Sequence, residues 1–340
     1  MSAEILATHT AALFATAVER AVELLRAGDV VALPTETVYG LAANALDAKA
    51  VAKIYEIKGR PAHNPIIVHV ADGEMAKRCV TAWPASASRL AKSFWPGPLT
   101  MVLPRAPIIP DIVTAGGATV GVRWPSHPFI QAVIREGGFP LAAPSANLSN
   151  SISPTNAAHV RKQLGDQLAL IVDGGQAQVG IESTVIDLVA QPPRVLRPGM
   201  IHEESLLAAL GEPEGPTGSG AAKQSGSELR SPGLLKKHYS PHARLVLRSW
   251  RDAADLNRKL SIFKVDHFRT HIIAHSHIPS GEGFGAVSVI PHDAEAFARA
   301  FYAELHRSDE AGAALIVVET LPAGPEWRAL ADRLTRAAAD

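Results

Sequence analysis

The chain has 340 residues, of which 47% are hydrophobic and 19% are charged, so it can build packed cores and global disorder is not expected. Its 33 basic residues are balanced by 33 acidic residues, so the chain lacks the net positive charge typical of proteins that bind long nucleic acids. A local basic cleft is still possible. The single cysteine, Cys79, excludes an intramolecular disulfide and fits a reducing compartment. The first 20 residues are not typical of a signal peptide, and no apolar run approaches the roughly 20 residues of a membrane span, so we expect a soluble cytoplasmic protein.

The predicted elements of the first 200 residues alternate between helices and strands. Apolar side chains at helical spacing predict a helix over 11–27, and Asp47 can cap a second helix that ends near Lys58. Short apolar runs predict strands at 30–33, 66–70, 99–103, 119–123, 141–143, 168–172, 184–189 and 194–196, with helices between some of them at 127–136 and 155–164. This alternation predicts an α/β domain built on a central sheet.

The composition changes after residue 211. Residues 212–233 are rich in Gly, Ser, Pro, Glu and Lys, which is typical of a linker. Strands are then predicted at 244–247, 271–274, 286–290 and 314–318, and helices at 251–260, 293–307 and 325–338. This second α/β pattern has no G-x-G-x-x-G turn, so nucleotide binding is not expected there. We expect domains over 10–205 and 243–340, joined by a linker over 206–242.

The motif at residues 34–40, PTETVYG, directly follows a predicted buried strand. Small hydroxyl residues at a strand end commonly cap the next helix. Ligands of open α/β sheets, however, bind beyond the carboxyl ends of the strands, where two threonines, a carboxylate and a tyrosine suit a small zwitterion. These residues alone leave both interpretations open.

The segment at residues 58–65, KGRPAHNP, places two cations before a predicted strand. Lys58 and Arg60 near a helix end can simply complement the helix dipole. In extended backbone they point the same way and form an anion clamp, with Arg60 offering a planar fork. His69 lies inside the following strand, where a hydrogen-bonded core histidine is the more common role.

Polar side chains also mark the ends of other predicted strands. Ser145 and Asn147 alternate in the turn at 143–149, which is either ordinary turn chemistry or a pair facing one cleft. Ser183 opens a strand, and Arg123 and Arg197 end two others. If these ends converge, they form one cleft for a polyanion.

Several well-known catalytic motifs are absent from the sequence. It contains no GxxxxGK[ST] loop, no GxSxG elbow, no cysteine pair and no HExxH helix. Any ATP site is therefore outside the P-loop class, and no protein-held metal site is expected.

Four motifs, at 33–41, 58–61, 144–149 and 182–187, occur in an order that closely resembles the YrdC-type threonylcarbamoyl-AMP synthases. Residues 197–199 resemble the end of that family's catalytic domain, and 231–233 with 237–241 resemble the linker of its longer, two-domain form. Each motif alone is weak evidence for the family, but four motifs in the family's order, followed by its linker motifs, identify the family with high specificity. Asn150 stands where the family usually has glycine; asparagine tolerates left-handed backbone, so we expect the turn to be kept.

The resemblance implies an α/β fold with a twisted, open, mostly parallel sheet and a concave basic cavity, followed by a smaller Rossmann-like domain. It implies that L-threonine, bicarbonate and ATP are joined into threonylcarbamoyl-adenylate for N6-threonylcarbamoyladenosine formation in tRNA. Threonine would contact Thr37, His69, Arg123, Ala143 and Ser183. ATP would contact Arg60, Asn64, Thr119, Ser145, Ser153, Arg197 and Tyr239, the last reaching back from a linker that acts as a lid. Lys58, Arg60, Ser145 and Asn147 would form the catalytic set at the phosphate and carbonate end.

The implied chemistry fits these residue types, because cations must bring mutually repelling anions together. Mg²⁺ would come with ATP, held mostly by phosphate oxygens, and the downstream partner would be the tRNA threonylcarbamoyl-transfer machinery. Direct contact with tRNA is left open. One alternative is an RNA-binding module without catalysis, which the neutral charge and the lack of interleaved aromatics disfavour. Another is a carbamoyl-transfer enzyme with a different acceptor, which the linker and second domain disfavour.

Overall fold

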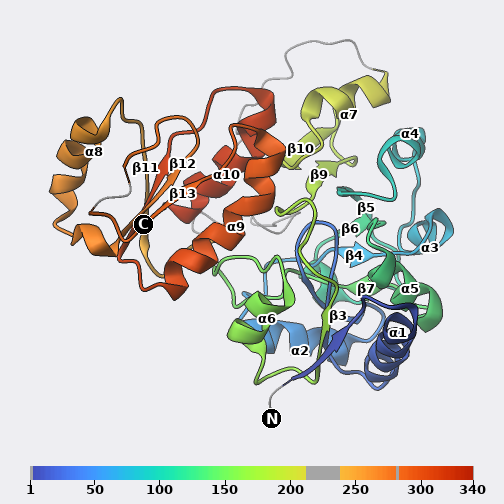
Figure 1. Ribbon diagram of the computed structural model, residues 1–340. Helices are drawn as coiled ribbons and strands as arrows, with labels where there is room; N and C mark the ends of the chain where they lie inside the picture. Colours follow the sequence, from blue (N-terminus) through green and yellow to red (C-terminus); the bar gives the residue numbers. More distant parts are fainter. Residues whose placement is uncertain (1–2, 212–237, 281–282, 340) are drawn as a thin grey trace.

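The computed structural model describes residues 3–211, 238–280 and 283–339. These residues form two α/β units that pack against each other (Figure 1). The predicted linker at 212–233 lies outside the described residues. Among those described, no helix has the length and apolar character needed to cross a membrane.

The two units contain most of the elements that the hydrophobic patterns predict. The first comprises β1 (Glu4–Ala7), α1 (Ala11–Arg26), β2 (Val31–Leu33), β3 (Gly40–Asn44), α2 (Ala48–Lys58), β4 (Val68–His69), α3 (Gly73–Arg78), α4 (Ala85–Phe94), β5 (Leu99–Pro104), β6 (Thr119–Arg123), α5 (Pro128–Gly137), β7 (Leu141–Ala142), α6 (Ala157–Leu164), β8 (Leu170–Asp173), β9 (Thr184–Asp187), β10 (Arg194–Arg197) and α7 (Glu203–Leu210). The second comprises β11 (Arg244–Arg248), α8 (Ala253–Leu260), β12 (Thr270–Ala274), β13 (Ala286–Val289), α9 (Ala294–Glu310), β14 (Leu315–Glu319) and α10 (Arg328–Ala337). The sequence patterns miss β1, α3, α4 and α7, and also β3, whose sequence GLAAN contains no β-branched or aromatic residue that would favour a strand.

The first unit is built on one open sheet with strand order β1-β8-β2-β3-β7-β4-β6-β5-β9-β10. Among the described strands, the pairs β1–β8, β8–β2, β4–β6 and β5–β9 are parallel. The other neighbouring pairs are antiparallel. The α/β class and the open sheet are confirmed, and the pairing is more mixed than the resemblance implies. Part of the reason is loop length: residues 34–39 are too short for a crossover, so β2 and β3 pair antiparallel.

Helix α2 illustrates how local sequence signals set an element that carries part of the site. The Asp47 side chain accepts hydrogen bonds from the main-chain nitrogens of Lys49 and Ala50 and so caps the start of the helix. Gly59 ends it with φ of 58°, a left-handed conformation that glycine adopts without steric cost. Both signals can be recognised in the sequence. Together they place Lys58 at the last residue of the helix and Arg60 just beyond it.

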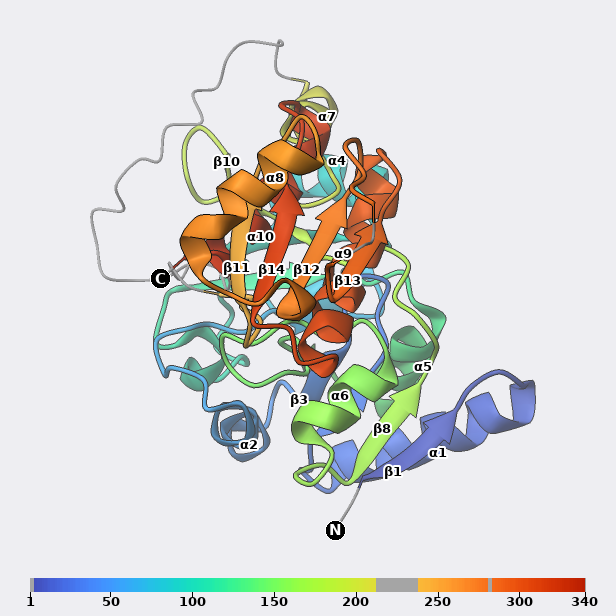
Figure 2. The same ribbon diagram turned by 60° about the vertical axis from the view of Figure 1, so that its left-hand side comes forward.

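The second unit is a four-stranded parallel sheet with order β11-β14-β12-β13, which confirms the Rossmann-like prediction. Successive side chains of its strands point to opposite faces of the sheet and join two apolar layers, one packed with α8 and the other with α9 and α10. Figures 1 and 2 show α8 on the outer face, and α9 and α10 on the face turned toward the first unit.

The interface between the units is part of a continuous apolar core. Val38, Ile152 and Ile181 of the first unit belong to one buried cluster with Phe297 and Phe301 of α9. A shared core of this kind holds the two units in a fixed relation. Residues on the inner side of α9 and α10 therefore lie close to the strand ends of the first unit.

Candidate functional site

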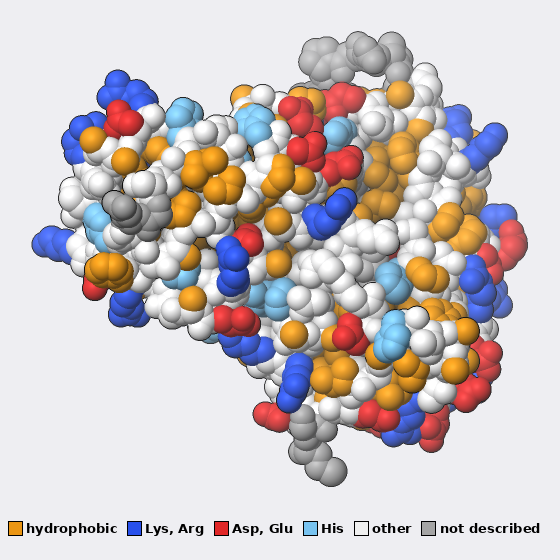
Figure 3. Space-filling model, in the orientation of Figure 1, with side chains coloured by type: hydrophobic (Ala, Val, Ile, Leu, Met, Phe, Trp, Pro, Cys, Tyr) orange, Lys and Arg blue, Asp and Glu red, His pale blue; other side chains and the backbone are white. Residues whose placement is uncertain are grey.

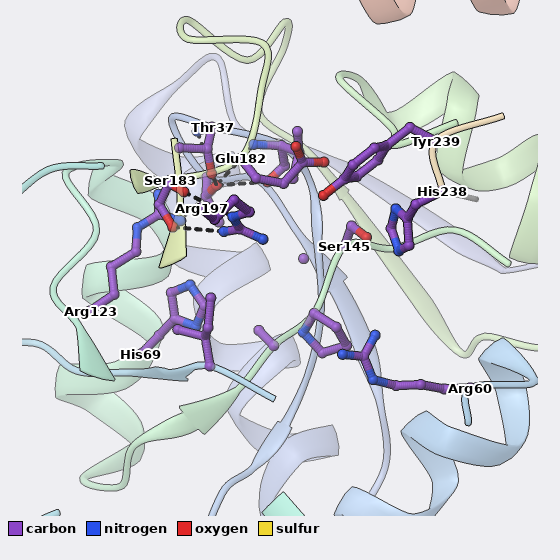
Figure 4. Close-up of a pocket in the computed structure, with 16 residues that line it drawn as sticks. Thr37, Arg60, His69, Arg123, Ser145, Glu182, Ser183, Arg197, His238 and Tyr239 are labelled. Atoms are coloured by element: carbon purple, nitrogen blue, oxygen red, sulfur yellow. Dashed lines mark hydrogen bonds between the residues drawn. The ribbon is translucent and has the colours of Figure 1, made fainter. Parts of the chain in front are cut away.

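A single pocket gathers polar residues from widely separated parts of the chain (Figure 4). It encloses about 540 Å³ of empty space, including its open mouth. Its lining residues are Thr35, Thr37, Val38, Gly40, Arg60, Ile67, His69, Arg123, Ala143, Pro144, Ser145, Glu182, Ser183, Arg197, His238 and Tyr239. Most of the strand ends and loops that the sequence singled out thus converge on one cleft, which was the condition for a polyanion-binding site.

Nine residues named in the sequence analysis line this pocket. They are Thr37, Arg60, His69, Arg123, Ala143, Ser145, Ser183, Arg197 and Tyr239. In Figure 4, His69 and Arg123 lie on one side of the cavity and Arg60, Ser145 and Tyr239 on the other. Thr37 and Ser183, also implied for threonine, lie toward the first side, whereas Arg60, Ser145 and Tyr239, implied for the nucleotide, lie on the second, and Arg197 lies beside Ser183.

The loop after β2 shapes the first side through its hydroxyl groups. Thr35 Oγ1 donates to the Val38 carbonyl oxygen at 2.6 Å and lies 2.9 Å from Thr37 Oγ1. The main-chain nitrogens of Thr37 and Val38 donate back to Thr35 Oγ1. Thr35 thus holds a tight turn and presents Thr37 to the pocket, which combines the turn-forming and ligand-facing interpretations of this motif.

Arg123 is buried at the end of β6 and pairs with a carboxylate of the chain itself. Its Nη2 lies 2.8 Å from Glu36 Oε1, an ion pair that lacks good hydrogen-bond alignment. Both side chains are about 95% buried. Glu36 thus offsets part of the Arg123 charge, which makes the burial of this guanidinium tolerable.

His69 ends β4 beside Arg123. Burial, together with the nearby Arg123 charge, lowers the pKa of His69 to about 3. The ring is therefore neutral at neutral pH, and its Nδ1 has no hydrogen-bond partner among the described residues. A neutral ring with an unused nitrogen is suited to a polar ligand, so His69 is more than a satisfied core residue.

Two further guanidinium groups line the cavity, that of Arg197 buried and that of Arg60 partly buried. Arg60 Nε and Nη2 donate to the carbonyl oxygens of Asn64 and Pro65 at 3.0 and 2.7 Å. Arg197 Nε and Nη2 donate to the Ser183 carbonyl oxygen and to Ser183 Oγ, both at 3.1 Å. Burial lowers the pKa of Arg60 to about 10 and also lowers the pKa of Arg197. Buried cations of this kind favour an anionic ligand, because it offsets the cost of their desolvation.

Lys58 and Asn147 lie behind the pocket wall, outside its lining. Lys58 is 2% exposed, and its Nζ donates to the Ser145 carbonyl oxygen at 2.5 Å and to both the main-chain and side-chain oxygens of Asn147. The Asn147 amide donates to the Ser151 carbonyl oxygen at 2.7 Å. These contacts brace the loop that presents Ser145.

Ser153, Asn64 and Thr119 also fall outside the pocket lining. Ser153 Oγ donates to Glu182 Oε1 at 2.6 Å. Asn64 is buried beside Arg60, and both polar atoms of its side chain lack a partner among the described residues. Thr119 begins the strand that Arg123 ends, which puts it roughly 13 Å along the strand from Arg123.

The sequence analysis assigned no role to Glu182 and His238, which also line the pocket. Glu182 opens the 182–187 motif, and an acidic residue directly before two hydroxyl residues is the signal that could have found it. His238 neighbours Tyr239, and its ring contacts the Tyr239 ring edge-on at 4.0 Å. Burial lowers the pKa of His238 to about 3, so this ring adds no charge to the pocket.

Segment 238–240 is held against the loop that contains Asn150. The Ser240 nitrogen donates to the Asn150 carbonyl oxygen at 2.9 Å. Asn150 adopts φ of 67°, the left-handed conformation that the family glycine would favour. The predicted turn is therefore kept, and it is one of the points where the end of the linker region docks.

Among the described residues, no group of three or more His, Cys, Asp or Glu side chains is arranged to hold a metal ion. The pocket carboxylate of Glu182 already accepts hydrogen bonds from Ser153 and Arg333. The donor set of the pocket is thus one of guanidinium and hydroxyl groups, which suits anions rather than a caged cation.

Two sequence families together span most of the chain. The family described as "Telomere recombination" matches residues 23–199, and the one described as "Threonylcarbamoyl-AMP synthase, C-terminal domain" matches residues 201–339. The chain is 38% identical over 316 residues to the threonylcarbamoyl-AMP synthase of Pyrococcus abyssi, covering 92% of this chain and 91% of that protein. It is 47% identical over 231 residues to the Bacillus subtilis protein of the same name, covering 68% of this chain and 66% of that protein.

Solved structures agree with these sequence relationships. The crystal structure of P. abyssi Sua5 complexed with L-threonine has a TM-score of 0.85 and 37% identity, and the match covers 94% of each chain. The structure of E. coli YciO matches 58% of this chain and 96% of its own, with a TM-score of 0.52 and 27% identity. With both of its domains matched, the chain belongs to the threonylcarbamoyl-AMP synthase family in its two-domain form.

Proposed function

We propose that this pocket joins L-threonine, bicarbonate and ATP into threonylcarbamoyl-adenylate and releases pyrophosphate, for threonylcarbamoylation of tRNA. The observation that carries the proposal is the convergence of three guanidinium groups on one cavity, those of the buried Arg123 and Arg197 and of the partly buried Arg60. Threonine, bicarbonate and ATP all carry anionic groups that repel one another. A preorganised cationic pocket can hold them together at little reorganisation cost.

Threonine would bind on the side formed by Thr37, His69, Arg123 and Ser183. The guanidinium of Arg123 would share its charge between Glu36 and the threonine carboxylate. The hydroxyl groups of Thr37 and Ser183 and the neutral ring of His69 would contact the amine and hydroxyl of the substrate. L-threonine as the substrate is supported by the crystal structure of the P. abyssi relative complexed with L-threonine, and its place on this side of the pocket is part of the proposal.

ATP would bind on the side formed by Arg60, Ser145 and Tyr239, with Arg197 reaching it from beside Ser183. The guanidinium groups would contact phosphate oxygens, and the loop at Ser145 would hold the phosphates near the threonine side. The buried side chain of Asn64, which has no partner among the described residues, is suited to contact the nucleotide. Ser153 and Thr119 remain proposed nucleotide contacts that would need a longer ligand or a shifted loop.

The proposed reaction has two steps. The threonine amine and bicarbonate first form a carbamate and water. A carbamate oxygen then bonds to the α-phosphorus of ATP, the bond from that phosphorus to the oxygen bridging to the β-phosphate breaks, and pyrophosphate leaves. Arg60 and Arg197 would stabilise the charge that develops around phosphorus. Lys58 and Asn147 would act through the Ser145 loop, whose backbone they brace.

We expect Mg²⁺ to arrive as part of the substrate, bound to the triphosphate. Mg²⁺ prefers phosphate oxygens and water to a dedicated protein cage. The pocket hydroxyl groups and any water would complete its coordination. The cytoplasmic location and the hand-over of the product to a tRNA-modifying partner are likewise predictions that rest on family membership.

The alternative of an RNA-binding module without catalysis is less well supported. On the face shown in Figure 3, acidic and basic side chains are interspersed around both domains. The buried cations of the pocket lie in a cavity too confined for an RNA duplex. Salt-dependent RNA binding without ATP turnover would favour this alternative.

The deciding experiment measures pyrophosphate release by the full-length protein. We expect release from MgATP only when threonine and bicarbonate are both present, together with formation of threonylcarbamoyl-adenylate detected by mass spectrometry. Release that does not depend on threonine would refute the proposal. Replacing threonine by other amino acids tests the related carbamoyl-transfer alternative, because a different preferred acceptor would support that alternative instead.

A further inference from the structure

Glu182 is a pocket residue of the first domain, and its carboxylate accepts hydrogen bonds from two residues of the second domain. Arg333 Nε of α10 donates to Glu182 Oε2 at 2.8 Å, and the Tyr302 hydroxyl of α9 donates to the same oxygen at 3.1 Å. Ser153 of the first domain donates to Oε1 at 2.6 Å. The carboxylate is therefore fully hydrogen-bonded, and two of its three donors come from the other domain.

The contact between Arg333 and Glu182 is almost completely shielded from water. The Arg333 side chain has no exposed surface and that of Glu182 is 8% exposed. Around them lies the apolar cluster that joins the two domains. A buried ion pair of this kind adds little net stability over apolar packing, so its presence calls for another role.

Arg333 also contacts Tyr239, which lines the pocket. Its guanidinium lies over the Tyr239 ring, 5.4 Å from the ring centre. One turn further along α10, the Arg336 carbonyl oxygen accepts a hydrogen bond from the His238 nitrogen at 3.3 Å. One stretch of helix in the second domain thus fixes both Glu182 and the segment that carries Tyr239.

We propose that Arg333 is a positioning residue for ATP binding, which fixes Glu182 and Tyr239 at the pocket wall and offsets the Glu182 charge next to the phosphate-binding arginines. The inference rests on the proposed function, because it assigns Arg333 a part in that same site. Without Arg333, the ionised Glu182 would attract the pocket guanidinium groups, above all that of Arg197, which already interacts with it electrostatically. The incoming phosphates would then meet an added negative charge and a displaced tyrosine.

The test uses the full-length protein and the variant Arg333→Met, which removes the charge and keeps the apolar bulk. We expect the KM for ATP to rise about tenfold, the factor that corresponds to one lost charge-assisted contact. The kcat at saturating ATP falls much less. Because a purely structural role would lower the active fraction and leave KM unchanged, an unchanged KM for ATP would overturn the proposal.

The double variant Glu182→Gln with Arg333→Met examines the charge argument directly. Removing both charges should return the KM for ATP toward the unmodified value; a double variant no better than Arg333→Met would overturn the argument. If Arg333→Met does not fold, Arg333→Gln takes its place, because its amide still donates to the carboxylate without a charge. The KM for ATP of Arg333→Gln is then compared with that of the unmodified protein and of Glu182→Gln with Arg333→Gln in the same way.

Arg328→Met is the matched control. Arg328 lies on the same helix and also forms an ion pair with the first domain, to Glu203 at 3.1 Å, but its side chain is 44% exposed and lies outside the pocket. Its loss should leave the KM for ATP unchanged; an equal rise would show that any loosening of the interface suffices. Calorimetric binding of ATP is measured in parallel. It still decides this inference if the unmodified protein releases no pyrophosphate, an outcome that counts against the proposed function alone.

Discussion

Lys58 holds Ser145 from behind the pocket: its ammonium nitrogen donates to the Ser145 carbonyl oxygen at 2.5 Å. The same nitrogen reaches two oxygens of Asn147. This cation therefore joins the end of α2 to the loop that presents Ser145, 87 residues later in the chain. Such a contact positions the loop, whereas Arg60, two residues further on, lines the pocket itself.

Lys58→Met should lower the free energy of unfolding by about 2–4 kcal/mol, because it leaves buried oxygens without a donor. Turnover should fall as well, since the Ser145 loop loses its brace. Urea denaturation and pyrophosphate release measure the two effects. Lys53→Met on the same helix is the control; its exposed ion pair with Asp29 should contribute less than about 1 kcal/mol. Full stability combined with lost turnover would instead give Lys58 a direct role in the chemistry.

Arg60→Ala should lower kcat/KM by about 10²–10³-fold, the loss typical of removing one preorganised donor to a developing negative charge. Arg60→Lys should recover little, because an ammonium cannot reproduce the planar fork. Circular dichroism should show an intact fold. Arg105→Ala is the control, since Arg105 also donates to a main-chain carbonyl oxygen, that of Ile109, but lies outside the pocket. An Arg60→Ala variant with full turnover would contradict the assignment.

Tyr239→Phe should leave stability unchanged and weaken ATP binding. The Tyr239 hydroxyl is buried and has no hydrogen-bond partner among the described residues, so its removal sacrifices no hydrogen bond within that part of the chain. Burial raises the pKa of Tyr239, so the phenol stays protonated and can donate to the nucleotide. Loss of one such hydrogen bond corresponds to about a two- to tenfold rise in the KM for ATP.

A contrasting variant separates these effects. Tyr55→Phe removes a hydroxyl that lies within hydrogen-bonding distance of the carbonyl oxygens of Asn64 and Ile112, so it should lower the free energy of unfolding by about 1 kcal/mol. If Tyr239→Phe is equally destabilised and binds ATP normally, its hydroxyl has an internal partner and no ligand contact.

The interface between the domains should weaken in acid. His159 of α6 and His306 of α9 stack with ring centres 3.8 Å apart. Burial lowers the pKa of each to about 4 from an ordinary value of 6.5, with Lys162 adding to the effect at His159 and His159 adding to it at His306. The separated or unfolded state therefore binds more protons below pH 6.5, and stability is lost as the pH falls from 6.5 toward 4.

Small-angle scattering and thermal unfolding across this pH range would measure the effect. The double variant His159→Phe with His306→Phe keeps the stacked rings and removes both titrations, so its stability should depend less on pH. Asp309 and Glu310 also lie near His306 and favour its protonated form, but they do not cancel the effect of burial. An equal acid response in the double variant would assign the pH dependence to other groups.

The sequence alone predicts the fold class and much of the site because both depend on local signals. Asp47 and Gly59 mark the ends of a helix through caps that act within a few residues. The polar motifs at strand ends predict one convergent pocket, since strand ends of a sheet lie near one another. The pairing of β2 with β3, by contrast, could not be predicted, because the sequence patterns give no strand at Gly40–Asn44.

Only the tertiary structure decides which polar groups face the cavity and which brace it. Lys58 and Arg60 look equivalent in sequence as cations two residues apart, yet Lys58 donates to main-chain oxygens 87 and 89 residues away, whereas Arg60 donates to those of the nearby Asn64 and Pro65. Glu182 finds its partner in Arg333, 151 residues later and in another domain. Hydrophobic periodicity and helix caps act over a few residues, so they can be recognised in the sequence. The partner of a buried charge depends on which surfaces pack together in the folded chain, and no local sequence pattern predicts that packing.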